Sequence, residues 1–332
     1  MHICRKWRRI VFASQRALRL QLLFTHGTPV LKTLDCWPTL PIAVRYGGLP
    51  ALDPPTPEDE GNIMAALKHS DRVTSIRLTV TSSLLERVSA IKRPFSELED
   101  LVLLSRDGVP LTLPSTFLCG PRLRRLHLTR IAVPALLQLL ISSKNLVYLR
   151  LQEFLNPMHI SPRELTNALS RMAQLRLLSL HFLSTIVYRA PPTPCGERVV
   201  LPVLDHFNFR GGSQYLERLV ARVDAPRLGN IEATFFDGSV FELPELIVFI
   251  GRIEMHKSYR RADIISSERA ISISLTQPEG PTCLKFQLFR KSLSKQLTFM
   301  ARICIPHSTF LFNVEDLRIS AERLSRQEGV EM

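Results

Sequence analysis

The chain has 332 residues, of which 45% are hydrophobic and 22% charged, the proportions of an ordinary folded protein. No apolar run approaches the ~20 residues that a membrane-spanning helix needs, so we expect no membrane partner. The net charge of +13 favours acidic partners, but Lys and Arg are spread along the chain without a basic block, so a nucleic-acid partner is disfavoured.

The N-terminal segment is basic and has no acidic residue before Asp35. Such a composition also occurs in mitochondrial presequences, but Trp7, Ile10, Val11 and Phe12 lie close together, as on the core face of a short helix. No secretory signal is visible, because the opening residues are charged where such a signal is apolar. We therefore expect a cytoplasmic or nuclear protein.

A leucine pattern, L-x-x-L-x-L, recurs through the middle of the chain. The four all-leucine copies are Leu98/Leu101/Leu103, Leu123/Leu126/Leu128, Leu146/Leu149/Leu151 and Leu175/Leu178/Leu180. Looser apolar copies are Val73/Ile76/Leu78, Leu204/Phe207/Phe209 and Leu228/Ile231/Ala233. Successive copies begin roughly 23 to 29 residues apart, within the range of leucine-rich repeats.

Each copy predicts a short strand whose three apolar residues point into a core and whose intervening residues point outward from a concave parallel sheet. The segments between copies carry helix signals. These are residues 56–59 (TPED) and 161–164 (SPRE), each with a capping residue followed by proline, the apolar stretch 134–141, and Ser213 as the cap of a helix whose face is Leu216, Leu219, Val220 and Val223. The fold class is thus α/β, an irregular leucine-rich-repeat solenoid with helices and loops on its convex side.

The repeats lack the asparagine that normally follows the last leucine by three residues and bridges successive loops. The residues at these positions are Thr81, Arg106, Ile131, Phe154, Leu183 and Gly212. We therefore expect irregular, partly helical connections rather than a regular horseshoe.

The repeat register weakens after about residue 234. Residues 243–255 predict a helix with Pro244 at its first position, and residues 270–275 and 283–288 alternate as short strands do. Residues 295–304 predict a helix and residues 314–319 a last strand. The proline-rich stretches 50–57 and 190–194 are interpreted as loops.

Outward strand positions define the candidate partner-binding face. They include Arg77, Arg125, His127, Tyr148, Arg150, Arg176, His206 and Arg210, with Ser75 beside them. Arg and Tyr often anchor interfaces, and a stripe of five arginines suits an acidic or phosphorylated partner. The alternative is that these residues are simply the solvated side of a sheet.

Catalytic, metal and cofactor signals are missing from the sequence. The cysteines Cys4, Cys36, Cys119, Cys195, Cys283 and Cys304 form no C-x-x-C pair, so we predict no metal and no cofactor. Reduced thiols are the simpler interpretation, although spacing alone leaves disulfides open. No H-E-x-x-H, G-x-S-x-G, G-x-G-x-x-G or P-loop motif occurs, so we expect no catalytic residues and no enzyme; a dispersed active site stays open.

Several segments resemble a known family. Residues 4–14 (CRKWRRIVFAS) resemble the last helix of an F-box, and similarity to F-box/leucine-rich-repeat proteins of mushroom-forming fungi extends over residues 34–38 (LDCWP), 98–101 (LEDL), 215–228 (YLERLVARVDAPRL) and 234–236 (TFF). The resemblance implies substrate recruitment by an SCF-type ubiquitin ligase, with the repeats holding the target. It also implies that Trp7, Arg8, Ile10 and Val11 face a Skp-type adaptor.

The sequence departs from that family at the F-box itself. The opening L-P-x-E/D-[IL]-L stretch of an F-box is absent here, and only its last helix is matched. We therefore expect a target-binding chain that lacks most of the adaptor-contacting surface, either a truncated start or a natural fragment. The alternative is a stand-alone repeat scaffold for an acidic protein, with nucleic acid less favoured. The expected division is an F-box remnant at 1–25, a solenoid at 26–240 and irregular C-terminal repeats or a cap at 241–332.

Overall fold

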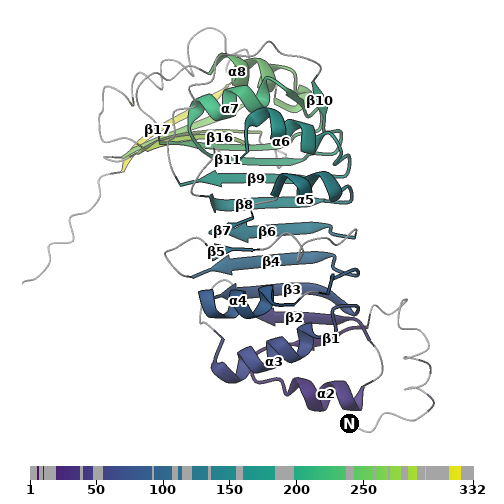
Figure 1. Cartoon of the computed structure of the whole chain (residues 1–332). Helices are drawn as coiled ribbons and strands as arrows, with labels where there is room; N and C mark the ends of the chain where they lie inside the picture. The colour runs from purple at the N-terminus through teal and green to yellow at the C-terminus, as the bar shows by residue number, and fades with distance from the viewer. Residues whose placement is uncertain are drawn as a thin grey trace, which may run out of the picture. The chain divides into compact units, whose positions relative to one another are not determined.

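The computed structural model describes most of the chain. The described residues are 20–37, 40–47, 55–91, 93–106, 111–113, 122–133, 136–154, 160–183, 198–236, 243–256, 259–267, 270–277, 283–289 and 314–322, with Lys6, Ile10 and Gln296 as single positions. The chain divides into two compact units, Met1–Leu146 (unit 1) and Val147–Met332 (unit 2). Each is a mixed α/β arrangement on a mostly parallel sheet (Figure 1).

Unit 1 alternates strands with helices. Its strands are β1 (Leu22–Phe24), β2 (Ile42–Tyr46), β3 (Val73–Val80), β4 (Asp100–Ser105), β5 (Leu111–Thr112), β6 (Arg125–Thr129) and β7 (Ile131–Ala132). Its helices are α2 (Val30–Cys36), α3 (Pro57–Leu67), α4 (Ser82–Ser89) and α5 (Leu136–Ser142). The strands β1, β2, β3, β4 and β6 pair side by side in chain order and all in parallel, while β5 pairs with β7.

The repeated leucines of unit 1 lie opposite one another in neighbouring strands. Leu101 of β4 is paired with Leu126 of β6, and Leu103 with Leu128. All four side chains are fully buried. The predicted strand geometry of the pattern, with leucines inward and their neighbours outward, is confirmed in these strands.

The start of α3 is the most heavily bonded helix terminus of unit 1. Thr56 is the N-cap that the sequence predicts, and it forms a capping box with Asp59, which also accepts hydrogen bonds from His26 Nδ1 at 2.9 Å and from the Gly27 N–H at 3.4 Å. Burial raises the pKa of Asp59, but these bonds from His26, Thr56 and Gly27 outweigh it and hold the pKa below its usual value. The carboxylate thus fastens the loop after β1 to the helix.

Unit 2 continues the alternation. Its strands are β8 (Tyr148–Phe154), β9 (Leu177–Phe182), β10 (Val199–Val200), β11 (His206–Gly211), β12 (Val223–Asp224), β13 (Asn230–Phe235), β14 (Arg261–Ser267), β15 (Ala270–Thr276), β16 (Cys283–Phe289) and β17 (Asp316–Glu322). Its helices are α6 (Pro162–Leu169), α7 (Ser213–Val220), α8 (Pro244–Gly251) and a 3-10 turn, η3 (Glu254–His256). Strands β8, β9, β11, β13 and β16 pair in parallel, and β16, β15 and β14 pair antiparallel before a parallel β17.

Helices cover one face of this sheet, and aromatic side chains join them to it. Tyr215 of α7 packs against both Phe182 and Phe209, with ring centroids 4.8 and 6.2 Å away, and its hydroxyl donates to the Ile160 carbonyl at 3.1 Å. Helix α7 also contacts both α6 and α8 (Figure 1). Burying these large side chains fixes the strands in register under the helices.

The C-terminal elements differ from the expectation in part. Strands β15 and β16 match the predicted residues 270–275 and 283–288, and α8 begins at Pro244 as expected but ends at Gly251. The sequence did not indicate β14, whose strand Arg261–Ser267 alternates less clearly. Of the predicted helix 295–304, only Gln296 is described, as helical and buried, and the stretch 190–194 lies outside the described residues.

Two of the helix starts show how the missing asparagines are replaced. Thr81 caps α4 by accepting from the Leu84 N–H at 3.3 Å, and Gly212 is the N-cap of α7. The prediction that Ser213 caps α7 is wrong, because Ser213 is already the first helical residue and Gly212 has no side chain to bond. The capping box Ser161/Glu164 of α6 is confirmed.

Glu217 of α7 is a partly buried carboxylate at the N-terminus of α8. It accepts hydrogen bonds from the backbone N–H groups of Glu245 and Leu246 at 2.8 and 2.9 Å. Burial raises the pKa of Glu217 to about 7, against the lowering effect of the two bonds, and the charge of Glu245 adds to the rise. The same unit holds His256, whose pKa burial lowers to about 4.

We expect Asp59→Ala to lower the free energy of unfolding by about 2–3 kcal/mol, because it removes a helix cap and leaves the donors of His26 and Thr56 without an acceptor. Glu164→Ala, at the same position of the α6 capping box, removes only bonds from Ser161 and should cost about 0.5–2 kcal/mol. Urea denaturation followed by circular dichroism measures both. Equal losses would contradict the clamping role of Asp59.

Glu217 should make stability fall as pH rises. Its pKa is higher in the folded chain than the usual 4.5, so the folded state holds the proton more tightly and loses that advantage between pH 4.5 and about 7. Glu217→Gln should therefore gain stability relative to the unsubstituted chain as pH rises. Urea denaturation at several pH values tests this, and His256 cancels because both chains retain it. Glu245→Gln is the control and should keep most of the dependence, since burial is the larger cause.

Candidate binding face

Alternate residues of five neighbouring strands point away from the helices of unit 2, and we call this set the outer face. It consists of Tyr148, Arg150 and Gln152 (β8), Leu177, Ser179 and His181 (β9), His206, Asn208 and Arg210 (β11), Asn230, Glu232 and Thr234 (β13), and Cys283, Lys285 and Gln287 (β16). Parallel pairing in register places residues of equal rank side by side, so they form rows across the strands.

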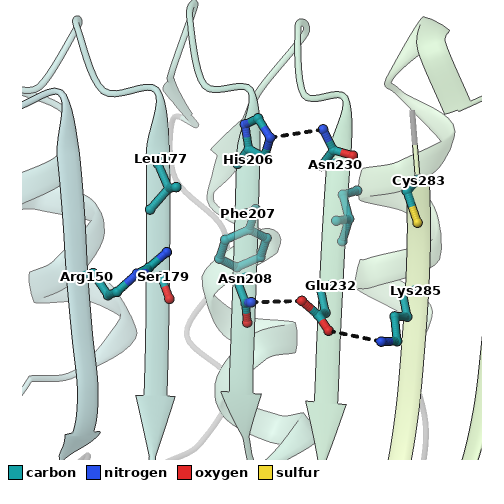
Figure 2. A pocket seen from close by; sticks show the side chains of 11 residues that line it. Arg150, Leu177, Ser179, His206, Phe207, Asn208, Asn230, Glu232, Cys283 and Lys285 are labelled. Carbon is teal, nitrogen blue, oxygen red and sulfur yellow. Dashed lines mark hydrogen bonds and ion pairs between the residues drawn. The ribbon is translucent and has the colours of Figure 1, made fainter. Parts of the chain in front are cut away.

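The outer face is hollowed by a pocket of about 350 Å³. Figure 2 shows its middle row, in which Arg150, Ser179, Asn208, Glu232 and Lys285 lie side by side on successive strands. The register of the strands pairs each of these residues with the next. This middle row is therefore polar, with a cationic side chain at either end, while Leu177, Phe207 and Ile231 add apolar surface to the lining.

Hydrogen bonds link side chains across all five strands. Asn208 Nδ2 donates to Glu232 Oε2 at 2.9 Å, and Lys285 Nζ lies 3.4 Å from Glu232 Oε1. On the other side of Asn208, its Oδ1 accepts from His181 Nε2 at 2.9 Å, and His181 Nδ1 accepts from Gln152 Nε2 at 3.3 Å. We call this chain of five residues the polar ladder. It assigns each amide and imidazole one orientation.

His181 is the imidazole of the ladder, and its ring is held in the neutral form. Burial lowers the pKa of its imidazole, and the charges of Arg210 and Arg150 lower it further, against the raising effects of the Asn208 hydrogen bond and of Glu232. A neutral ring with its proton on Nε2 satisfies both hydrogen bonds at once. The ladder is therefore complete without a charge on His181.

The two arginines of the outer face have different surroundings from Lys285. Neither Arg150 nor Arg210 forms an ion pair with any residue in the described ranges, whereas Lys285 is paired with Glu232. The guanidinium of Arg210 lies over the ring of Phe236, with its Cζ 4.8 Å from the centroid, and 5.8 Å from that of Phe289. The stack restricts the side chain of Arg210 while leaving its N–H groups available.

The upper edge of the pocket in Figure 2 is formed by His206 and Asn230. His206 Nδ1 lies 3.0 Å from Asp205 Oδ2, and its Nε2 accepts from Asn230 Nδ2 at 3.2 Å (Figure 2). Burial raises the pKa of the Cys283 thiol, which lies on the pocket wall and is in no disulfide. This thiol is therefore protonated and a poor nucleophile at neutral pH.

Unit 1 has its own outward side chains, and these are largely paired. Arg77 Nη2 lies 2.6 Å from Asp100 Oδ2, and Ser75 donates to the same oxygen at 3.2 Å. The sequence pattern placed Ser75 beside the outward residues of the candidate binding face, but in the structure Ser75 is buried. Arg125 of β6 is the register partner of Asp100 of β4. On the same strand as Arg125, His127 Nε2 lies 3.2 Å from the Thr129 hydroxyl.

The eight residues predicted from the sequence divide between the units. Arg77, Arg125 and His127 lie in unit 1, whereas Tyr148, Arg150, His206 and Arg210 lie on the outer face of unit 2. Arg176 is the exception, because β9 begins at Leu177 and Arg176 lies in the exposed turn before it. Its backbone carbonyl accepts the N–H groups of Asp205 and His206 at 2.9 and 3.0 Å.

The predicted adaptor-facing set is described at one position only. Ile10 is helical and 48% exposed. Trp7, Arg8 and Val11 lie outside the described residues. The adaptor-facing role of the set therefore stays a prediction.

The sequence analysis missed His181, Asn208, Glu232 and Lys285. The period of two was sufficient to find them, since each occupies an outward position next to a buried residue of the repeat or of β16. The predicted face consisted mainly of arginine, tyrosine and histidine residues, so it did not include the Asn208 amide and the Glu232 carboxylate that link the strands.

Comparison with known proteins gives no relative: no family model, no curated protein and no solved structure matches this chain. Among the described residues, no cluster of three or more His, Cys, Asp or Glu side chains is placed to hold a metal ion. None of the helices in the described ranges has the length and apolar character needed to cross a membrane.

Proposed function

We propose that the chain is a protein-binding module of the leucine-rich-repeat type, and that the outer face of unit 2 holds an acidic segment of its partner. The observation that carries the proposal is the pocket across five parallel strands, whose middle row is polar, while the other face of the sheet is packed under helices. Arg150 lines this pocket, Arg210 lies farther along the outer face, and neither has an ion-pair partner among the described residues. Concave polar surfaces with a few convergent charges are typical binding sites.

The chain order of the strands supports the solenoid part of the proposal. Each parallel strand of the repeats follows its neighbour in sequence, and every leucine of the four all-leucine copies is at most 4% exposed. This is the arrangement that stacked repeats adopt when each buries its apolar triplet against the next. The irregular connections fit repeats without an asparagine ladder.

Charge and residue type support the acidic partner. Arg150 and Arg210 present planar donors suited to carboxylates, and Arg210 is already held by two aromatic rings. An arginine that is ordered before binding loses less conformational entropy on binding. The single carboxylate in the middle row, Glu232, is engaged by Asn208 and Lys285 and does not neutralise these arginines.

The resemblance to F-box proteins suggests what such binding is for. In that family the repeats recruit a target to a ubiquitin ligase, so we propose substrate recruitment as the role of the module. Partner capture without any ubiquitin connection is the alternative, and it uses the same face.

The binding part is tested by selecting random displayed peptides on the purified chain. We expect the enriched peptides to be acidic and to bind Arg150→Glu at least about tenfold more weakly, because the charge reversal repels them from the pocket. Arg163→Glu is the matched control: it lies exposed on α6, changes the net charge equally and should leave affinity unchanged. Neutral peptides, or equal losses in both variants, would refute the proposed face.

The recruitment part is tested separately with a purified Skp-type adaptor. The chain extended by its upstream coding sequence should capture the adaptor if that sequence encodes the remaining F-box helices, and Trp7→Ala should weaken the capture. Binding is measured by co-purification. If the extended chain carries those helices and still fails to bind, the ligase role is excluded while partner binding stands.

A further inference from the structure

His181 lies between two arginines on the outer face. Arg210 of β11 is its register partner, and Arg150 of β8 is the register partner of Ser179, whose hydroxyl oxygen is 3.4 Å from His181 Nε2. Neighbouring strands are about 4.8 Å apart, so the two guanidinium groups belong to strands roughly 10 Å apart with the imidazole on the strand between them.

The surroundings of His181 define what its ring can do. From β8 it meets Gln152 and Arg150, from its own strand Ser179, from β11 Asn208 and Arg210, and from β13 the charge of Glu232. Gln152, Ser179 and Asn208 contact the imidazole through their side chains, while Arg150, Arg210 and Glu232 act on it through their charges. Two cations against one engaged carboxylate leave a local excess of positive charge.

An anion bound above His181 would relieve that excess in two ways. It would pair with Arg150 and Arg210, which have no ion-pair partner in the described part of the chain. It would also offset the two charges that help to keep the imidazole neutral. Because Glu232 is held by Asn208 and Lys285, an anion that pairs with both arginines has to come from outside the described part of the chain.

We propose that a carboxylate of the acidic partner binds over His181 between Arg150 and Arg210, and that His181 takes up one proton as the carboxylate arrives. This rests on the proposed binding face and adds to it the position of one partner side chain and a coupling to pH. The result is a contact that tightens as pH falls.

The proton exchange involves Nδ1 of His181 and the side-chain amide of Gln152. The proton comes from solvent and goes to Nδ1, which accepts from Gln152 Nε2 in the neutral ring. Rotation of the Gln152 amide brings its Oε1 to the Nδ1 of His181 as an acceptor. The Nε2–H of His181 continues to donate to Asn208. One negative charge and one proton enter together, so the half-buried ladder gains no net charge.

The test follows His181 by NMR in the full chain, with N-acetyl-glutamate amide as the probe. N-acetyl-glutamine amide with sodium chloride at equal ionic strength is the matched control. The signal of His181, one of nine histidines, is assigned by its loss in His181→Asn. We expect the glutamate probe to raise the pKa of His181 and its affinity to rise by up to about tenfold per pH unit as the pH falls.

Arg150→Gln and Arg210→Gln should each abolish the effect of the probe on His181, and Arg163→Gln should not. An unchanged His181 titration at the highest soluble probe concentration would overturn the inference. So would a response to N-acetyl-phosphoserine amide alone, which would assign the site to phosphate. If acidic peptides bind with Arg150 dependence while His181 does not respond, the proposed function stands and only this inference fails. If His181 responds to the glutamate probe and no acidic peptide is selected, the carboxylate site over His181 stands and the acidic partner segment of the proposed function is refuted.

Discussion

The structure depends on burial of an apolar triplet in each repeat. Each leucine of such a triplet stabilises the fold by about 1.5–3 kcal/mol when it leaves water, and the triplets of neighbouring strands bury one another. Leu101, Leu126 and their equivalents meet only if the strands run parallel and in register. The core therefore sets the register, and a slip by one residue would expose every leucine.

The same register arranges the outer face. Side chains between the leucines have no part in the core, yet they are forced into rows with a spacing of one strand. Polar partners then meet without any segment of their own to position them, as Arg77 meets Asp100 in unit 1 and Asn208 meets Glu232 in unit 2. A row whose charges all cancelled would be a stable surface and a poor binding site. The outer face of unit 2 departs from that balance at Arg150 and Arg210.

Sequence periodicity was sufficient to predict the repeated strands and the two capping-box helices, because both signals are local. In the repeats from Leu98 to Leu180, apolar residues alternate with outward residues along each strand. Thr56 and Ser161 each mark a helix start, because proline and an acidic residue follow within the next three positions. Strand β14 escaped because its place depends on antiparallel pairing with β15, a contact that no local pattern encodes. The outward direction of Arg150 was predictable from Leu149 and Leu151.

The pairing of outward residues was not predictable, since it depends on which strands are neighbours and on rotamers. Asp100 could be recognised as the partner of Arg77 only once β3 and β4 were in register. The exposure of Ser75 was overestimated for the same reason, and Arg176 was placed on a strand that begins one residue later. A repeat pattern thus predicts on which side of the sheet each residue lies, but not which residues pair across neighbouring strands.

The polar ladder connects stability to recognition. His181 joins two hydrogen bonds only as a neutral ring, and its neutrality is maintained by burial and by two arginines that have no carboxylate partner among the described residues. Pairing either arginine within the chain would have stabilised the free protein but would have removed the attraction for an anion. The aromatic stack under Arg210 offers a different solution, because it orders the guanidinium without neutralising it. The fold therefore keeps two cations, unpaired within the described ranges, on the strands that flank a group that can accept a proton.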